Sequence, residues 1–166
     1  MLRQKDEAGR LDLDAYPHSF EHRTLFADTD AFRHINNGAI ARYFEEGRAD
    51  INRQVFGDEV MTNPPGQLQL LFAANYIEYL AQLHYPDQVT IATAIGQVGK
   101  SSWQVLQAGF TGGNCFALAT ATLVKANTGM PSPLTEQERQ KLHAFDFEPH
   151  ALEDQLLIHK PGASSA

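Results

Sequence analysis

The stretch FADTDAFRHINNGAIARYFEEGR, residues 26–48, carries the strongest structural signal in the chain. Its first half is polar and irregular and ends in two asparagines, whose side chains can accept hydrogen bonds from the free N–H groups at a helix start. The pattern therefore predicts a helix of about five turns that begins near Asn36 or Asn37 and ends at Gly57. The apolar positions of this helix recur at spacings of three and four: Ile40, Tyr43, Phe44, Gly47, Ile51 and Val55.

Extended segments surround this helix. Residues 19–26 alternate in polarity and predict a first strand. After the turn-forming NPPG at 63–66, four segments are rich in Val, Ile, Thr, Tyr and Phe and are separated by short reversals, which predicts strands that follow one another as antiparallel neighbours. A capping-box spacing from Thr135 to Glu138 predicts a short helix over residues 135–145. The four later strands are expected at residues 67–79, Gln88–Val98, Ser102–Thr111 and 115–124.

A long apolar helix beside a mostly antiparallel sheet can bury its stripe if the sheet curls around it. The element order therefore predicts an α+β protein with the hotdog fold, in which a curved antiparallel sheet wraps around a long central helix. We expect one domain at residues 18–146, with a polar N-terminal tail at 1–17 and a C-terminal tail at 147–166 that ends in small and helix-breaking residues.

Composition limits the classes of function. With 166 residues, 43% hydrophobic, the chain is large enough to bury a core without disulfides, and its single cysteine, Cys115, can form no internal disulfide. The net charge of −7 argues against broad nucleic-acid binding. No apolar run has the length of a secretory core or a membrane span, which favours a cytoplasmic protein without a membrane span.

Residues 26–48 resemble the 4-hydroxybenzoyl-CoA thioesterase-like family of hotdog proteins, which includes long-chain acyl-CoA thioesterases. That family shares an Asp-x-x-x-His-(Val/Ile)-Asn-Asn segment followed by a helix with aromatic, Glu-Glu and Arg positions. The likeness continues more weakly through VGKSS at 98–102 and NTGMPSPL at 127–134. The matching residues here are Asp30, His34, Ile35, Asn36, Asn37, Tyr43, Glu45, Glu46 and Arg48.

The resemblance implies that Asp30 is the catalytic carboxylate of a thioester hydrolase. Hydrolysis needs an activated water or a carboxylate that attacks directly, so Asp30 is expected to act as general base or nucleophile. Free N–H groups near Asn37 and Gly38, at the positive end of the helix dipole, are expected to polarise the thioester carbonyl. The absence of a side chain at Gly38 would allow close approach of the substrate.

Other polar residues in the motif have two interpretations. His34 is expected either to support catalysis or to form a structural hydrogen bond. Asn37 is a helix-capping residue that can also touch substrate or water, and Asn36 is a cap. Asp28 is expected to brace the loop. Another hotdog branch places its catalytic carboxylate on the central helix, which leaves Glu45 and Glu46 as alternatives, although pairing of Glu45 with Arg48 is the commoner outcome.

Lys100, Ser101 and Ser102 form a turn between two predicted strands. In the resembling thioesterases the equivalent basic turn often contacts the phosphates or pantetheine of coenzyme A, and an ammonium beside hydroxyl and backbone donors suits phosphate. The alternative is an ordinary solvated hairpin turn. The glycine spacing of a nucleotide P-loop is absent, which disfavours ATP hydrolysis. Cys115 lies in an apolar strand and is expected to be a small core residue rather than a nucleophile.

Hotdog proteins commonly cover a sheet edge by pairing two protomers, so we expect a homodimer with the pocket between protomers, and a tetramer of two such dimers is the alternative assembly. The expected reaction converts acyl-CoA and water to a carboxylate and coenzyme A, without cofactor or metal. Acyl-thioester hydratase or dehydratase chemistry is one alternative, although the Asp-x-Asn-Pro-x-His spacing of one hydratase group is absent; a non-catalytic acyl-CoA binding module is another. Phe32, Tyr43, Phe72 and Tyr76 are expected either to line an acyl slot or to form ordinary core.

Overall fold

The computed structural model describes residues 3–62 and 67–149. Its long helix α1 (Asn37–Phe56) begins where the Asn36 side chain accepts a hydrogen bond from the Ala39 N–H at 2.8 Å. It ends at Gly57, whose φ of 91° lies in the region that favours glycine. The predicted start and end of this helix are therefore confirmed.

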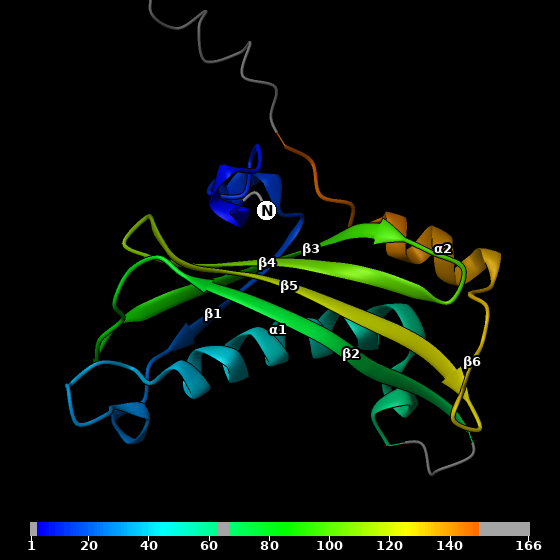
Figure 1. The fold of residues 1–166 in the computed structure, drawn as a ribbon, viewed down its shortest axis with the longest axis horizontal. Helices are drawn as coiled ribbons and strands as arrows, with labels where there is room; N and C mark the ends of the chain where they lie inside the picture. Colours follow the sequence, from blue (N-terminus) through cyan, green and yellow to red (C-terminus); the bar gives the residue numbers. More distant parts are fainter. Residues whose placement is uncertain (1–2, 63–66, 150–166) are drawn as a thin grey trace, which may run out of the picture.

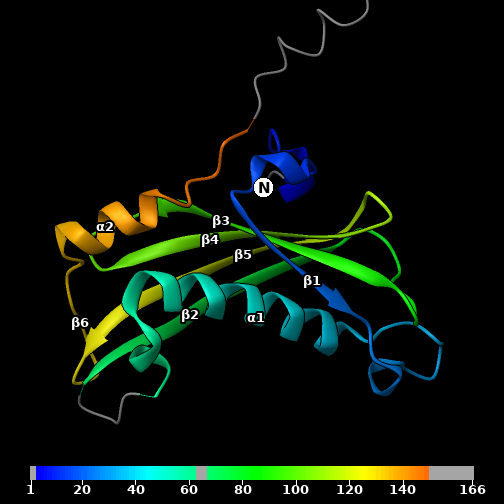
Figure 2. The ribbon, with the colours of Figure 1, turned by 180° about the vertical axis from the view of Figure 1, so that it is seen from behind.

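One antiparallel sheet curls over α1, with the strand order β1-β3-β4-β5-β2 and the short β6 beside β5. Figures 1 and 2 show α1 along one face of this sheet. This arrangement confirms the predicted hotdog fold. The strands are β1 (His18–Arg23), β2 (Leu68–Tyr79), β3 (Gln88–Val98), β4 (Ser102–Thr111), β5 (Asn114–Asn127) and β6 (Met130–Pro131).

The core between α1 and the sheet contains the residues of the predicted apolar stripe. Phe44 and Ile51 on α1 are fully buried, and Trp103 on β4 stacks near Phe56 with a ring separation of 5.1 Å. Gly47 allows the helix to approach the sheet, because a Cβ there would lie 2.7 Å from the Thr93 hydroxyl. The close approach fixes the position of α1, and therefore of its N-terminus, relative to the strands.

Residues 3–17, set apart above as a polar tail, pack on the opposite face of the sheet from α1 (Figures 1 and 2). Small side chains at Ala92, Ala94 and Ala108 leave room on that face for Ala15 and Tyr16. The Arg10 guanidinium is fully buried and donates to the Gln107 and Ala119 carbonyls. The only part of the predicted C-terminal tail that is described is residues 147–149.

Two details of the sequence prediction are wrong. The first strand ends at Arg23 instead of continuing to residue 26, because the chain forms a 3-10 helix over Phe26–Asp28. The strands β2 and β3 follow one another in sequence but are not neighbours, since β2 pairs with β5 at the edge of the sheet. The connection over residues 80–87 instead crosses beside the loop before α1, where the Ile35 N–H donates to the Leu83 carbonyl at 2.8 Å.

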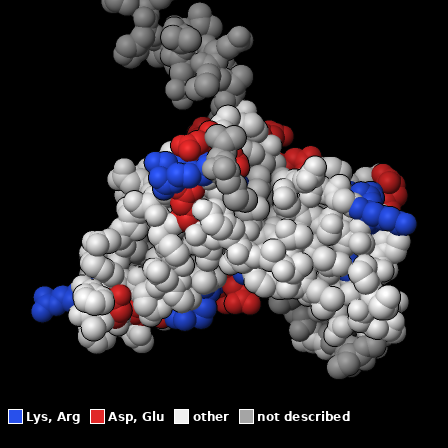
Figure 3. Space-filling model, viewed as in Figure 1, with Lys and Arg blue, Asp and Glu red and all other residues white. Residues whose placement is uncertain are grey.

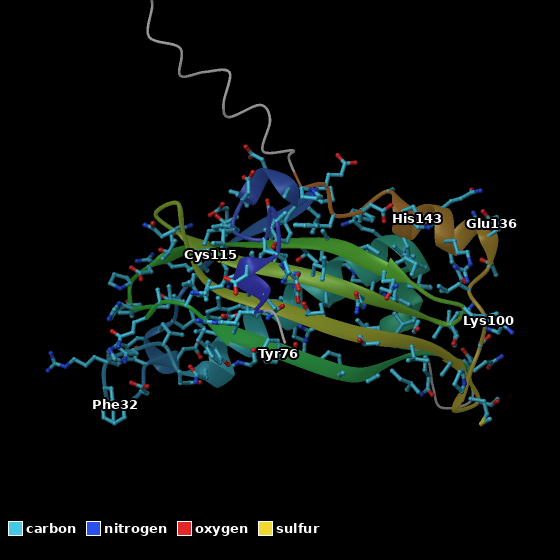
Figure 4. All side chains as sticks on the ribbon, turned by 45° about the horizontal axis from the view of Figure 1, so that its top comes forward. Phe32, Tyr76, Lys100, Cys115, Glu136 and His143 are labelled. Atoms are coloured by element: carbon cyan, nitrogen blue, oxygen red, sulfur yellow. The ribbon has the colours of Figure 1, made fainter. Side chains whose placement is uncertain are left out.

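The short helix α2 (Glu136–His143) has the predicted capping box between Thr135 and Glu138. The Glu138 carboxylate also accepts a hydrogen bond from Lys125 at 2.7 Å. Burial of Glu138 raises its pKa, but the hydrogen bonds from Lys125 and Thr135 outweigh burial, so the pKa is lowered overall. These bonds hold α2 against the end of β5, at the end of the sheet that also carries Lys100 (Figure 4).

Candidate active site

The loop before α1 is shaped by one oxygen of Asp30. Oδ1 accepts the backbone N–H groups of Phe32 at 2.8 Å and His34 at 3.1 Å, and the Asp30 N–H donates to the His34 carbonyl at 2.8 Å. Arg33 closes this turn with a φ of 66°, which is uncommon for a residue other than glycine. The other carboxylate oxygen, Oδ2, accepts no hydrogen bond from the residues that the structure describes, and it is therefore free to meet a ligand.

Asp28 has the bracing role expected of it. Its side chain is buried and accepts hydrogen bonds from the Tyr43 hydroxyl at 2.7 Å and from Arg42, while its carbonyl accepts from the Asn36 amide at 3.0 Å. Burial raises the pKa of Tyr43, and the hydrogen bond to Asp28 raises it further. Asp28 thus joins the loop to the first two turns of α1 and keeps Asp30 close to the helix start.

We expect the substitution Asp28→Ala to lower the free energy of unfolding by about 2–3 kcal/mol, because it leaves the buried Tyr43 hydroxyl without its acceptor. The substitution Arg42→Ala should cost about 1 kcal/mol or less, because the Arg42 side chain is 59% exposed. Urea denaturation of both variants measures the difference. Equal effects of the two substitutions would contradict this bracing role.

The first turn of α1 presents two free amide donors beside this loop. Asn36 uses its side chain and carbonyl to satisfy the N–H groups of Ala39 and Ile40. The N–H groups of Asn37 and Gly38 donate to no acceptor in residues 3–62 and 67–149, and both residues are exposed. Free donors at the positive end of a helix stabilise an oxygen that gains negative charge.

Asp30 and the start of α1 share one cavity of about 310 Å³. The loop and the helix form one side of it, and the end of β2 with the connection that follows forms the other. The Tyr79 hydroxyl joins the two sides, because it donates to the Asn37 carbonyl at 3.3 Å. Its lining consists of Asp30, His34, Ile35, Asn37, Ile40, Tyr79, Leu80, Ala81, Gln82 and Leu83.

His34 lies in the same cavity, and its ring meets that of His84 edge to face, with centroids 5.2 Å apart. Among the described residues, the His34 imidazole forms no hydrogen bond with Asp30. The wall formed by Tyr79 and residues 80–83 was not among the predicted site residues. Nothing in the sequence signals this wall, because the segment resembles an ordinary turn between neighbouring strands, and its role follows from the crossing of the chain.

Lys100, Ser101 and Ser102 lie outside this cavity. The Ser101 carbonyl accepts the Lys125 N–H at 2.8 Å, which places the turn at the end of the sheet beside α2. Figure 4 shows Lys100 and Phe32 at opposite ends of the molecule. Lys100 is exposed, and the Arg139 side chain donates to its carbonyl at 3.2 Å. Figure 3 shows basic side chains directly beside acidic ones at this end of the molecule.

The remaining candidate residues lie outside the cavity of Asp30. Glu45 and Glu46 are exposed on α1 and do not line this cavity. In the described residues Glu45 forms no ion pair with Arg48, which instead donates to the Gln107 side chain at 3.0 Å. Cys115 is half-buried, and burial raises the pKa of its thiol to about 11, as expected of a packing residue.

The four aromatic residues considered for an acyl slot have different positions. Tyr43 is buried and held by Asp28, so it belongs to the core. Phe32 is 78% exposed at the tip of the loop. Phe72 and Tyr76 are about half exposed along β2, the edge strand, and do not line the cavity of Asp30.

This fold defines a class of protein, the hotdog-fold thioesterases, and comparisons with known proteins agree. The family model described as the thioesterase-like superfamily matches residues 24–142. The chain therefore belongs to the thioesterase-like superfamily. No curated protein matches the chain.

Solved structures of similar fold include several thioesterases. A predicted thioesterase from Bacillus stearothermophilus is 25% identical, with a TM-score of 0.72 over 80% of this chain and 98% of the other. A thioesterase from Thermus thermophilus, complexed with coenzyme A and Zn, is 23% identical, with a TM-score of 0.70 over 76% and 98%. A 1,4-dihydroxy-2-naphthoyl-CoA thioesterase from Synechocystis is 14% identical, with a TM-score of 0.66 over 75% and 97%.

Two further features of the described residues bear on the site. No helix in them has the length and apolar character needed to cross a membrane. Among residues 3–62 and 67–149, no three His, Cys, Asp or Glu side chains form a group that could hold a metal ion.

Proposed function

We propose that the protein hydrolyses an acyl-CoA thioester to a carboxylic acid and coenzyme A, with Asp30 as the reacting carboxylate. The observation that carries this proposal is the cavity in which Asp30 lies beside the first turn of α1. The free Oδ2 of Asp30 and the free N–H groups of Asn37 and Gly38 supply the two requirements of the reaction, a base or nucleophile and donors for an oxyanion.

The reaction can proceed in two ways from this geometry. As a general base, Asp30 takes a proton from water while the water oxygen attacks the carbonyl carbon. As a nucleophile, Asp30 attacks that carbon itself and forms an anhydride, which water then hydrolyses. In both routes, the carbonyl oxygen gains negative charge near the N–H groups of Asn37 and Gly38. The C–S bond then breaks, and the coenzyme A sulfur leaves and takes up a proton. His34 is placed to orient the water or to hydrogen-bond the carbonyl.

The edge strand β2 supports a homodimer. One side of β2 pairs with β5, and its other edge pairs with no strand in the described residues. An unpaired edge with exposed apolar side chains is a surface that another strand can cover. The exposed apolar residues of β2 are Leu71, Phe72, Tyr76 and Tyr79.

Two-fold pairing of β2 with its copy would complete the site. An antiparallel β2 pair places the Tyr79 end of one strand beside the Leu68 end of the other. The cavity of Asp30 lies at the Tyr79 end. Leu68 pairs with Asn127 at the other end, where Val124 pairs with Ser102. A dimer of this kind brings Lys100 of one protomer toward Asp30 of its partner, so that coenzyme A can bridge the two chains, with Ser101 and Ser102 beside its phosphates or pantetheine.

We expect Lys100→Ala to raise KM for acyl-CoA by about threefold to tenfold with little change in kcat, because the lost contact stabilises substrate and transition state equally. Steady-state kinetics at low ionic strength measure both constants. Lys5→Ala, which removes an exposed lysine from the N-terminal segment, is the matched control and should change neither. An unchanged KM in Lys100→Ala would remove this residue from the coenzyme A site.

The function is tested by a panel of acyl-CoA and aryl-CoA thioesters, with release of free thiol as the signal. Hydrolysis without added metal or cofactor is the expected result, since coenzyme A enters only as part of the substrate. Tight binding of acyl-CoA without thiol release would instead indicate a binding module. The single unpaired Cys115 favours a reducing compartment, and cytoplasmic location is part of the proposal.

A further inference from the structure

Four exposed apolar side chains gather at the end of the molecule that carries the loop before α1. Leu25, Phe26 and Phe32 belong to this loop, and Tyr85 belongs to the connection between β2 and β3. The rings of Phe26 and Tyr85 meet edge to face, with centroids 5.6 Å apart. Figure 4 shows Phe32 at the extreme end of the molecule. We call these four residues the apolar tip.

Neither the core nor the candidate active site accounts for the apolar tip. Phe26 and Phe32 are 75% and 78% exposed, and no member of the tip lines the cavity of Asp30. Single exposed apolar residues are ordinary on a protein surface, whereas a group of them marks a place where a protein meets a partner. The apolar tip is therefore explained by a partner that removes its rings from water.

Hydrogen bonds hold the two parts of the apolar tip in place. The Thr24 N–H donates to the Asp87 carbonyl at 3.0 Å, and the Thr24 hydroxyl donates to the His84 carbonyl at 3.0 Å. These bonds join the loop before α1 to the connection that carries Tyr85. The Phe32 N–H is held by the Asp30 carboxylate. The side chains are thus arranged before a partner binds, which lowers the entropy lost on binding.

Two free cations flank the apolar tip. Arg23 is the last residue of β1, and Arg33 directly follows Phe32 in the loop. Both side chains are exposed, and neither forms an ion pair with another described residue. Figure 3 shows a basic side chain that projects beyond the acidic ones at this end of the molecule, on the left of the view. These arginines are therefore available to an anionic partner.

The acidic groups near these arginines have partners within the protein. The Asp28 carboxylate is buried and bonded to Arg42, and the Asp87 carboxylate accepts the His84 N–H at 3.0 Å. Glu21 accepts a hydrogen bond from a β3 hydroxyl at 2.8 Å, and Asp30 lies in its cavity. The outward charge at the tip is therefore positive, although the net charge of the chain is −7.

We propose that the apolar tip, with Arg23 and Arg33, docks on a membrane surface that contains anionic lipids. The rings enter the boundary between head groups and acyl chains, and the two guanidinium groups pair with lipid phosphates. A lipid surface adapts to protruding side chains, whereas a folded partner would need a matching pocket for each. Anionic lipids lie on the cytoplasmic leaflet, which agrees with the cytoplasmic location proposed above.

Docking in this way brings the candidate active site to the lipid. Phe32 and Asp30 belong to one turn, so the cavity of Asp30 lies close to the surface that the tip enters. An acyl-CoA with a long apolar acyl group collects at a bilayer, because each buried CH₂ group favours partition. Vesicle binding itself goes beyond the proposed function, since it does not depend on hydrolysis of a thioester.

The test is co-sedimentation of the whole chain with phosphatidylcholine vesicles, with and without phosphatidylglycerol. We expect binding to the vesicles that contain phosphatidylglycerol and weaker binding at high salt. The double substitution Phe26→Ser with Phe32→Ser should lower the partition coefficient by about tenfold or more. Arg23→Gln with Arg33→Asn should also lower it by about tenfold or more, and asparagine tolerates the positive φ of position 33.

Leu11→Ser with Met130→Ser is the matched control, because both residues are exposed apolar residues outside the apolar tip. This variant should bind vesicles as the wild type does, and all variants should keep their thermal midpoint, since the replaced side chains are exposed. A wild-type protein that does not bind the anionic vesicles, or tip variants that bind them normally, would overturn the inference. A tip variant with a smaller assembly in sedimentation velocity would also overturn it, because the tip would then be a contact between copies.

Discussion

Replacement of Asp30 by asparagine should lower kcat by about a thousandfold, the range expected when a positioned base or nucleophile is lost. The variant should remain folded, because the asparagine carbonyl can still accept the Phe32 and His34 N–H groups that Asp30 holds through Oδ1. The substitution therefore changes mainly Oδ2, the carboxylate oxygen that accepts no hydrogen bond from the described residues. Thiol release under substrate saturation measures kcat, and the thermal midpoint verifies folding.

Asp58→Asn is the matched control, because it also replaces one aspartate by asparagine. Asp58 is exposed just beyond the far end of α1. It should leave kcat within about twofold of the wild type, as surface substitutions usually do. A folded Asp30→Asn variant with normal turnover would remove Asp30 from the reaction. The glutamates Glu45 and Glu46 of α1 would then be the next carboxylates to substitute.

The second large effect is expected at the edge strand. The double substitution Phe72→Glu with Tyr76→Glu should convert the proposed dimer to monomers and abolish most hydrolysis, because it would add like charges along two paired copies of β2. Both side chains are about half exposed in the protomer, so each chain should still fold. Sedimentation velocity gives the oligomeric state, and thiol release gives the activity of the same sample.

Leu11→Glu is the matched control, since Leu11 is an apolar residue that is 50% exposed in the N-terminal segment, on the opposite face of the sheet from α1. This variant should remain dimeric and active. A double variant that is monomeric yet fully active would show that one chain contains the complete site. A double variant that remains dimeric would place the interface on another surface.

The sequence predicted the central helix and most strands because their patterns are local. Asn36 and Gly57 mark the ends of α1 by side-chain capping and a left-handed backbone, which depend on neighbouring residues only. The position of β2 at the edge is a long-range result. In the sequence, the connection from β2 to β3 looks like a turn between neighbouring strands. Only the pairing of β2 with β5 shows that this connection links two strands that are not neighbours in the sheet.

The sequence predicted the motif residues of the candidate site, but it did not predict the walls of the cavity. Asp30, His34 and Asn37 do line one cavity, as the resemblance to the thioesterase family implied. Tyr79 and the segment after it come from a distant part of the chain with no polar signature. Arg10 is another residue that the sequence concealed, because a charged residue in a polar stretch predicts exposure, whereas its guanidinium is buried against the sheet.

The most direct measurement is a crystal structure of Asp30→Asn with an intact acyl-CoA substrate. The thioester oxygen should lie about 2.7–3.1 Å from the N–H groups of Asn37 and Gly38, with the side chain at position 30 facing the carbonyl carbon. The nucleotide end should lie at Lys100 of the other protomer. A thioester bound away from the first turn of α1, with position 30 facing solvent, would contradict this account.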